Sequence, residues 1–131
     1  MMPRYSFVIP VYNRPDEIRE LLQSMLELDF SKNFEVVIVE DGSSLTSENI
    51  CKEFGVSLDI QYFYKKNSGP GDSRNFGMKK ARGDWFLILD SDVILPENYL
   101  REVDSFLASN ACDCFGGPDA AHKNFTRIQK A

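Results

Sequence analysis

The sequence predicts an α/β fold in which helices cover both faces of a mostly parallel sheet. Short apolar segments alternate along the chain with segments whose apolar residues recur at helical spacing, and the connections between them are short. Polar clusters follow successive apolar segments, and we expect nothing comparable at the amino ends of the strands. A length of 131 residues suits one core, so we expect a single domain over residues 1–131.

The first part of the chain predicts a strand, a helix and a second strand. Residues 5–11 are almost continuously apolar, which is typical of a strand buried on both faces. Asn13 is expected to cap a helix that has Pro15 and Asp16 in its first turn. The core positions of that helix are Ile18, Leu21, Leu22, Met25 and Leu26. Residues 34–39 then predict a buried strand that ends in a turn at 40–44.

The alternation continues to the end of the chain. The predicted elements are a helix at 46–54 that stops at a left-handed Gly55, a strand at 58–64, a glycine-rich turn at 67–71, a helix at 72–81 ended by Gly83, a strand at 85–89, a helix that begins at Pro96, and a fifth strand at 113–117. The pattern fades afterwards, so we expect the chain to be the N-terminal part of a longer protein.

Composition and charge exclude several classes of function. Hydrophobic residues make up 43% and charged residues 27%, as in ordinary globular proteins. A net charge of −5 argues against nucleic acid or an anionic membrane as the main partner. The chain opens without a signal peptide, and no apolar stretch approaches the ~20 residues of a membrane helix. We therefore expect a cytoplasmic segment with no membrane contact, although the parent protein could sit at a membrane.

The cysteines and the single histidine do not form a recognisable site. Cys51, Cys112 and Cys114 are odd in number and lack a CxxC spacing, which fits neither a disulfide scaffold nor a zinc site. We interpret them as reduced, partly buried thiols. His122 has no second ligand motif near it and is interpreted as an exposed polar residue, with a role as metal ligand or at an acceptor site as the alternative.

The candidate chemistry lies where the predicted strands end. Ligands of open parallel sheets bind beyond the carboxyl ends of the strands. Asp90 and Asp92 follow the most hydrophobic strand and, on extended backbone, would point the same way toward a shared cation. Their hard oxygen ligands suit Mg²⁺ or Mn²⁺, which would also allow an acidic protein to bind an anionic substrate. The alternative is a solvated turn that carries two acidic residues.

Three other positions could contact a nucleotide. Glu40 and Asp41 could accept hydrogen bonds from a base or a ribose, or could simply build a turn. Arg74 follows a glycine-rich loop and could face an anion, or could be an ordinary surface arginine. Tyr12 could stack on a base or be an ordinary aromatic residue at a strand end.

Four motifs, taken together and in order, resemble the family 2 glycosyltransferases of the GT-A fold. They are VIPVYNR at 8–14, VIVEDGSS at 37–44, NSGPG with SRNFG at 67–71 and 73–77, and LILDSD at 87–92. Each motif is weak alone, whereas four in this order and spacing are specific. The resemblance implies a Rossmann-like GT-A sheet and transfer of a sugar, usually UDP-linked, with inversion. It also implies a saccharide or lipid-linked acceptor and a place in cell-envelope polysaccharide biosynthesis.

The resemblance also implies roles for individual residues. In the family, residues matching Tyr12, Glu40 and Asp41 surround the base and ribose, and the arginine matching Arg74 lies near the base and diphosphate. Of the two aspartates of the DxD motif, the one matching Asp90 contacts the ribose and the one matching Asp92 binds the metal. The expected donor-binding residues are Pro10, Tyr12, Asn13, Glu40, Asp41, Gly69, Arg74 and Asp90, and the expected metal ligands are Asp92 and Asp90.

Two features depart from the family pattern. Glu40 stands where the family often has aspartate, which keeps the charge but lengthens the reach. The general base lies in the family well beyond the DxD motif, so we expect it outside residues 1–131. Asp119 is available but is expected to serve acceptor-side structure or nothing. We therefore expect this chain to bind a donor without turning it over.

Two other functions also fit the sequence. An apolar strand followed by DxD is also the first motif of haloacid-dehalogenase-like phosphatases, in which Asp90 would be the nucleophile and Asp92 the acid/base. In those enzymes, however, the motif normally follows the first strand. The other alternative is a non-catalytic nucleotide-binding or regulatory domain.

Overall fold

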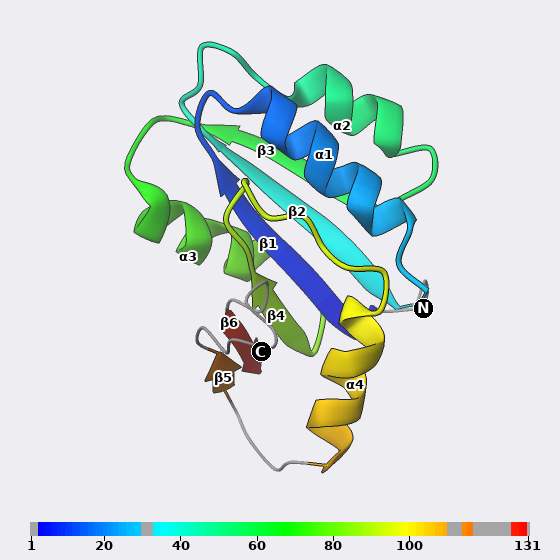
Figure 1. Cartoon of the computed structure of the whole chain (residues 1–131). Helices are drawn as coiled ribbons and strands as arrows, with labels where there is room; N and C mark the ends of the chain where they lie inside the picture. Colours follow the sequence, from blue (N-terminus) through cyan, green and yellow to red (C-terminus); the bar gives the residue numbers. More distant parts are fainter. Residues whose placement is uncertain (1–2, 30–32, 110–113, 117–126, 131) are drawn as a thin grey trace.

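The computed structural model describes residues 3–29, 33–109, 114–116 and 127–130, and its strands form one mixed sheet in the order β3-β2-β1-β4-β6-β5 (Figure 1). The strands are β1 (Tyr5–Val11), β2 (Phe34–Asp41), β3 (Ile60–Lys65), β4 (Trp85–Ile88), β5 (Cys114–Gly116) and β6 (Arg127–Lys130). The helices are α1 (Pro15–Leu26), α2 (Glu48–Phe54), α3 (Pro70–Lys80) and α4 (Tyr99–Ser109). The predicted α/β fold with a mostly parallel sheet is confirmed.

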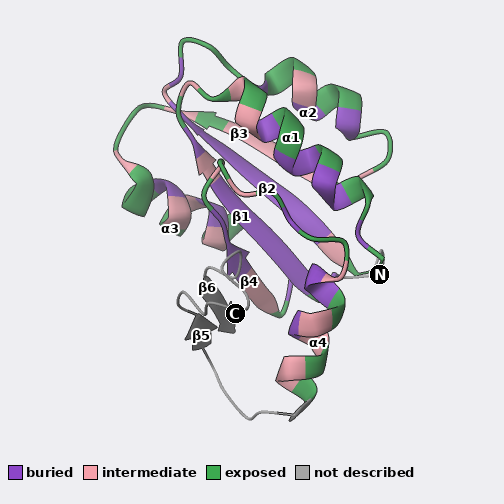
Figure 2. Cartoon of the chain, in the orientation of Figure 1, coloured by how far each residue is buried: buried purple, intermediate pink, exposed green. Residues whose placement is uncertain are grey.

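The first four strands form the parallel part of the sheet. β1 lies at its centre and pairs along its whole length with β2, from Tyr5 opposite Phe34 to Val11 opposite Glu40. β4 pairs with the other edge of β1, and β3 pairs with β2. The central strands are buried, as their apolar sequences predict (Figure 2). Because these strands run in one direction, all four carboxyl ends reach the same edge of the sheet.

The two faces of the sheet are covered by different helices. Phe7, Ile9 and Ile38 belong to the main core, which the buried residues of α1 and α4 complete. Val8, Val37 and Val39 alternate with them and face α3 on the opposite side. Figure 1 shows α1 and α2 together on one face and α3 on the other. A residue's position along a strand therefore decides which layer its side chain enters.

Helix α3 lies close to the sheet because Gly77 has no side chain. A Cβ atom added there would lie 2.6 Å from Cγ1 of Val8 and 3.2 Å from Cγ2 of Val39. Gly77→Ala is therefore expected to lower the free energy of unfolding by about 1 to 2 kcal/mol, because overpacking outweighs the better helix propensity of alanine. Urea unfolding would measure the loss. Gly71→Ala is the control, since its Cβ would meet nothing within 4 Å; equal stabilities for the two variants would contradict this account.

Several predicted helix ends are wrong by a few residues. Helix α1 is capped by Arg14 instead of Asn13, with no side-chain hydrogen bond at the cap. Helix α2 begins at Glu48, and Gly55 has a right-handed φ of −64° instead of the predicted left-handed conformation. The helix predicted from Pro96 begins at Tyr99, whose N–H donates to the Pro96 carbonyl across a preceding turn. Cap residues specify a region of the chain, while tertiary packing sets the final boundary.

Other boundaries differ in the same way. Strand β3 is shifted to Ile60–Lys65, α3 begins at Pro70 and is capped by Ala81, and β4 ends at Ile88. The predicted fifth strand exists as β5, but it pairs antiparallel with β6, which the sequence pattern did not predict. β6 in turn pairs antiparallel with β4. In the described part of the chain, no helix is long and apolar enough to span a membrane.

A buried polar network lies at the amino end of β2, so the prediction that nothing comparable would sit at the amino ends of the strands is wrong. Glu35 is completely buried. It accepts hydrogen bonds from Ser6 Oγ at 2.6 Å, Gln61 Nε2 at 2.8 Å and the Arg82 backbone N–H at 2.6 Å, and it forms an ion pair with the Arg82 guanidinium at 2.9 Å. Burial alone would raise the pKa of Glu35, but these donors outweigh it and hold that pKa below its ordinary value.

Candidate functional site

A cavity of about 500 Å³ opens at the carboxyl ends of β1 and β4. Its lining residues are Pro10, Val11, Tyr12, Arg14, Glu17, Asp41, Pro70, Asp90, Ser91 and Asp92. Five of these were predicted from the sequence as donor or metal contacts: Pro10, Tyr12, Asp41, Asp90 and Asp92. The structure thus brings residues from three strand ends to one place.

The position of the cavity follows from the strand order. The chain passes from β1 to β2 and β3 on one side, and then returns to place β4 on the other side of β1. Loops that leave β1 and β4 therefore diverge, which opens a crevice between these two strand ends. This reversal of strand order is where open α/β sheets bind their ligands.

Asp41 is the buried anchor of the cavity. The two atoms Asp41 Oδ1 and Lys65 Nζ are 2.8 Å apart, and both side chains are largely buried. The backbone N–H of Ser68 donates to Oδ1 at 2.8 Å, and that of Gly69 donates to Oδ2 at 3.0 Å. Burial alone would raise the pKa of Asp41, but Lys65 and these N–H groups hold it below its ordinary value. A carboxylate whose lowered pKa favours the ionised form therefore holds the loop before α3 against the end of β2.

Gly42 allows this loop to approach. Its φ is +74°, and a Cβ there would lie 2.7 Å from both Cβ and N of Asn67. The Asn67 side-chain amide donates to the Asp41 carbonyl at 2.8 Å. Glycine is required at this position both by the left-handed conformation and by the close contact.

Glu40 does not reach the cavity, although it is adjacent to Asp41. It is completely buried. Its oxygens accept hydrogen bonds from Ser43 Oγ at 2.5 Å, Ser47 Oγ at 2.9 Å and Tyr62 Oη at 2.9 Å. Successive residues of a strand point to opposite faces, so Asp41 enters the cavity side while Glu40 holds the loop that leads to α2. The described contacts give Glu40 a structural role, and a contact with a donor stays a prediction.

Asn13, Gly69 and Arg74 lie around the cavity without lining it. Asn13 has a φ of +53°, and its Oδ1 accepts the backbone N–H groups of Ser44 and Leu45 at 2.8 and 2.9 Å. Arg74 Nη2 lies 3.9 Å from Asp90 Oδ1, which places the guanidinium beside the cavity as a loose ion pair. Their donor contacts therefore also stay predictions.

Asp90 and Asp92 lie in a turn, so the expectation of extended backbone is wrong here. β4 ends at Ile88, and the Val93 N–H donates to the Asp90 carbonyl at 3.3 Å. Both carboxylates nevertheless line the same cavity, and the Asp90 side chain is 69% exposed. Such an oxygen-only pair fits Mg²⁺ or Mn²⁺, which take one or two carboxylates together with substrate phosphates and waters. Among the described residues, no group of three or more acidic, histidine or cysteine side chains is arranged to hold a metal, so diphosphate oxygens would have to complete the coordination.

Sequence reasoning missed Arg14, Glu17 and Ser91 as cavity residues. Glu17 lies in the first turn of α1, and its Oε1 accepts a hydrogen bond from Ser91 Oγ at 2.7 Å. Its signal in the sequence is its place directly after the first strand, where the N-terminus of a helix meets the carboxyl edge of the sheet. The spacing of apolar residues alone assigns it only to the polar side of α1.

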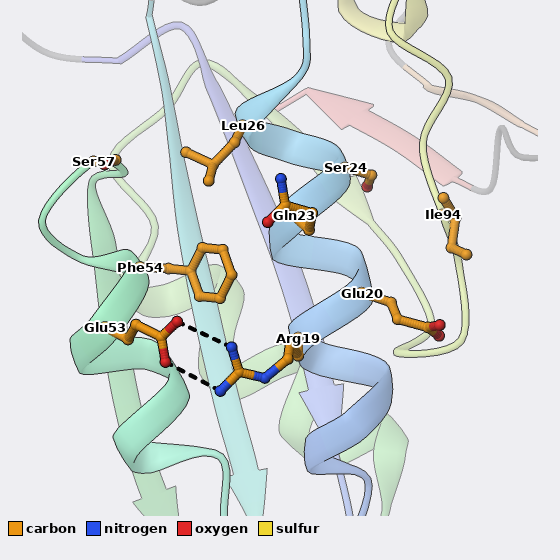
Figure 3. Close-up of a pocket in the computed structure, with 9 residues that line it drawn as sticks. All are labelled: Arg19, Glu20, Gln23, Ser24, Leu26, Glu53, Phe54, Ser57 and Ile94. Carbon is orange, nitrogen blue, oxygen red and sulfur yellow. Dashed lines mark hydrogen bonds and ion pairs between the residues drawn. The ribbon is translucent and has the colours of Figure 1, made fainter.

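A second hollow, of about 570 Å³, lies between α1, α2 and the loop after β4 (Figure 3). Arg19 and Glu53 form a two-pronged ion pair across it, with both N···O distances at 3.0 Å. Figure 3 shows the Phe54 ring beside this pair and Ile94 on the opposite rim. This hollow lies away from the strand ends that carry the candidate chemistry, so we place the functional site in the cavity of Asp41, Asp90 and Asp92.

The remaining residues predicted to be inert or peripheral are only partly described. Cys51 is a free, buried thiol, and burial raises its pKa to about 12, as expected for a core cysteine. Cys112, Asp119 and His122 lie outside the described residues, and the interpretations given to them stay predictions.

Comparison with known proteins agrees with the motifs. The model of the family described as glycosyl transferase family 2 matches residues 6–130. An uncharacterized glycosyltransferase of Rickettsia bellii is 37% identical over 107 residues, which cover 82% of this chain and 15% of that protein. The poly(ribitol-phosphate) beta-N-acetylglucosaminyltransferase TarS of Staphylococcus aureus is 32% identical over 115 residues, which cover 86% of this chain and 20% of TarS. The chain therefore spans only a small part of the length of these relatives.

Solved structures show the same fold. Residues 1–349 of S. aureus TarS in complex with UDP-GlcNAc match with a TM-score of 0.84 at 27% identity, covering 97% of this chain and 45% of that one. A mannosyltransferase from Pyrobaculum calidifontis in complex with GDP-Man and Mn²⁺ matches with a TM-score of 0.82 at 19% identity, covering 99% and 45%, which supports the fold alone. The sheet is that of the GT-A glycosyltransferases. With a family model that covers nearly all of its residues, the chain belongs to glycosyl transferase family 2.

Proposed function

We propose that this chain is the donor-binding part of a longer glycosyltransferase that uses a UDP-linked sugar together with Mg²⁺ or Mn²⁺. The observation that carries the proposal is the meeting of Asp41, Asp90 and Asp92 with the Tyr12 ring in one cavity. The similarity to a TarS structure with bound UDP-GlcNAc supports a uridine nucleotide as the donor.

The cavity offers separate surfaces to the two ends of a nucleotide sugar. Tyr12 is 53% exposed, so its ring can stack on a base. Asp41 Oδ1 already accepts hydrogen bonds from Lys65 and Ser68. Oδ2 accepts the Gly69 N–H at 3.0 Å and has the Asn67 amide only at 3.5 Å, so Oδ2 can accept a hydrogen bond from the nucleotide in place of that long contact. At the other end, Asp90 and Asp92 would hold the cation. When bound, that cation would stabilise the charge that develops on the departing diphosphate.

We propose that the described residues bind the donor and that the base for the inverting step lies outside them. Inversion requires a carboxylate base on the face of the sugar opposite the diphosphate. Four carboxylates line the described cavity, and each already has another role. Glu17 accepts a hydrogen bond from the Ser91 hydroxyl, Asp41 holds the loop before α3, and Asp90 and Asp92 are assigned to the donor and its cation. We therefore propose that the base and the site for a saccharide or lipid-linked acceptor come from other parts of the enzyme.

Calorimetric titration with UDP, with and without Mn²⁺, tests this proposal. We expect binding that depends on Mn²⁺ and that falls by at least about tenfold in Asp92→Ala, because one of the two carboxylates that hold the cation is lost. Asp84→Ala is the matched control, since Asp84 is an exposed aspartate just before β4, outside the cavity. Equal affinity with and without metal, or an unchanged Asp92 variant, would refute the metal site.

Separate observations bear on the remaining alternatives. Family membership excludes the haloacid-dehalogenase-like phosphatase, and here the DxD turn follows the fourth strand. A non-catalytic nucleotide-binding domain would be excluded by measured sugar transfer from the full-length enzyme, which the donor-binding titration alone does not measure. Transfer of sugar from UDP-GlcNAc by the 131-residue chain itself, measured by release of UDP, would refute the statement that this chain only binds the donor.

A further inference from the structure

Glu17 connects two segments of the cavity that lie far apart in the sequence. It belongs to the first turn of α1, and its Oε1 accepts a hydrogen bond from the Ser91 hydroxyl at an O···O distance of 2.7 Å. The two residues are 74 positions apart in the sequence. Ser91 stands between Asp90 and Asp92, and all four side chains line the same cavity. The contact therefore joins α1 to the turn that carries both proposed metal ligands.

The turn at 90–92 has few other constraints. The Leu89 N–H donates to the Val8 carbonyl, after which the chain leaves the sheet. Within the described part of the chain, two side-chain contacts hold residues 90–92: the bond from Ser91 to Glu17 and the 3.9 Å ion pair from Arg74 to Asp90. A serine hydroxyl has one proton to donate, so its bond to Glu17 fixes the rotamer of Ser91 and limits the motion of the turn.

A carboxylate suits this position better than a neutral acceptor. Hydrogen bonds from a hydroxyl to an ionised oxygen are shorter and about twice as strong as neutral ones. The charge of Glu17 is also favoured by its place in the first turn of a helix and by Arg14, whose Nε lies 3.9 Å from Oε2. A third negative group can therefore stand beside the two aspartates without itself serving as a ligand.

We propose that Glu17 is a positioning residue, which acts through Ser91 to hold Asp90 and Asp92 in the orientation that binds the cation and the donor diphosphate. This inference rests on the proposed function. It assigns the role to the hydrogen bond with Ser91, so that neither Glu17 nor Ser91 contacts the metal.

The test uses Glu17→Ala, Ser91→Ala, the double variant and Glu17→Gln, with Glu20→Ala as control. Glu20 is exposed on the same helix, one turn further on, outside the cavity. Titration with UDP and Mn²⁺ is expected to show affinity reduced about tenfold in each alanine variant, and no further in the double variant, because both remove the same bond. Glu17→Gln keeps an acceptor oxygen and should restore most of the affinity. Binding of UDP without metal should not change in any variant.

A second measurement needs neither nucleotide nor metal. Amide NMR spectra of the free protein should show the same shifts at residues 90–93 in Glu17→Ala and Ser91→Ala, with faster hydrogen exchange at Val93, and none of this in Glu20→Ala. If the wild type fails to bind UDP but these shifts appear, the proposed function is wrong, while the hydrogen bond from Ser91 to Glu17 still holds the turn. If the wild type binds UDP and the Glu17 variants have the affinity and amide shifts of the Glu20→Ala control, the positioning role of Glu17 is wrong, while the proposed function stands.

Two results would replace the inference with another role. Losses that add up in the double variant would mean that Glu17 and Ser91 act separately. A Glu17→Gln variant as weak as Glu17→Ala would mean that Glu17 acts on the metal directly, because glutamine still accepts the Ser91 hydrogen bond. Either result overturns positioning through Ser91.

Discussion

Replacing Glu35 with alanine is expected to lower the free energy of unfolding by about 3 to 5 kcal/mol, the largest loss predicted for a single side chain in this protein. Glu35 is completely buried, and its removal leaves the Ser6 hydroxyl and the Arg82 N–H without their acceptor and takes one of its two acceptors from the Gln61 amide. These groups join β1, β2, β3 and the loop before β4. The variant therefore weakens the start of the strand that delivers Asp90 and Asp92.

The same network predicts how stability depends on pH. The pKa of Glu35 is lower in the folded protein than its unfolded value of about 4.3, so its contribution is complete at neutral pH and is lost as the pH falls through the lowered pKa. Glu35→Gln cannot ionise, so its free energy of unfolding should change less between neutral pH and about pH 3. Urea unfolding followed by the fluorescence of Trp85, the single tryptophan, measures both effects.

Glu53→Ala is the matched control for Glu35→Ala. Glu53 also pairs with an arginine, Arg19, but both side chains are at least half exposed. Solvent-exposed ion pairs contribute little to stability, so this variant should unfold almost like the wild type. If Glu35→Ala were no less stable than Glu53→Ala, the buried network would not be what holds this end of the sheet together.

Lys65→Met is expected to lower the free energy of unfolding by about 3 kcal/mol and to weaken UDP binding. The Lys65 and Asp41 side chains are only 12% and 6% exposed, so the substitution leaves a buried carboxylate without its cation. Without Lys65, the pKa of Asp41 rises toward its ordinary value, because burial is then opposed only by the N–H groups of Ser68 and Gly69. The loop that Asp41 holds through Ser68 and Gly69 then loosens at the proposed donor site.

The stability of this variant depends less on pH than that of the wild type. In the wild type, the lowered pKa of Asp41 gives stability that disappears in acid. In Lys65→Met, the part of that lowering that comes from Lys65 is absent, so less stability is lost as the pH falls. The stability difference between the two proteins should therefore narrow as the pH falls below about 4, where Asp41 takes up a proton. Lys66→Met is the control because Lys66 is exposed. A loss of the same size in both lysine variants, or a difference that does not change with pH, would contradict the ion pair.

The sequence predicted well those features that depend on local pattern. Buried strands such as Tyr5–Val11 are continuous apolar runs, and the amphipathic helix after it has one apolar face. The sequence also predicted that Tyr12, Asp41, Asp90 and Asp92 lie at one edge of the sheet, because the carboxyl ends of parallel strands lie at the same edge. What remained uncertain was the exact helix ends and the backbone of the DxD turn.

Glu40 and the last two strands show which features a sequence pattern does not distinguish. Glu40 and Asp41 are adjacent acidic residues after one strand, and the sequence treats them alike. The structure separates them, because neighbouring strand residues point to opposite faces and only one face meets the cavity. The antiparallel pairing of β5 and β6 was missed for a related reason, since such short strands carry too few residues for a periodic signal.

By itself, the sequence determined the α/β order, the polar edge of the sheet and the family, because these depend on local periodicity and on short motifs. Only the tertiary structure decided which polar residues meet. The bonds from Ser91 to Glu17 and from Arg82 to Glu35 join residues 74 and 47 positions apart. Such pairs form only when the strand order brings distant segments together, and no spacing within a single motif records that proximity.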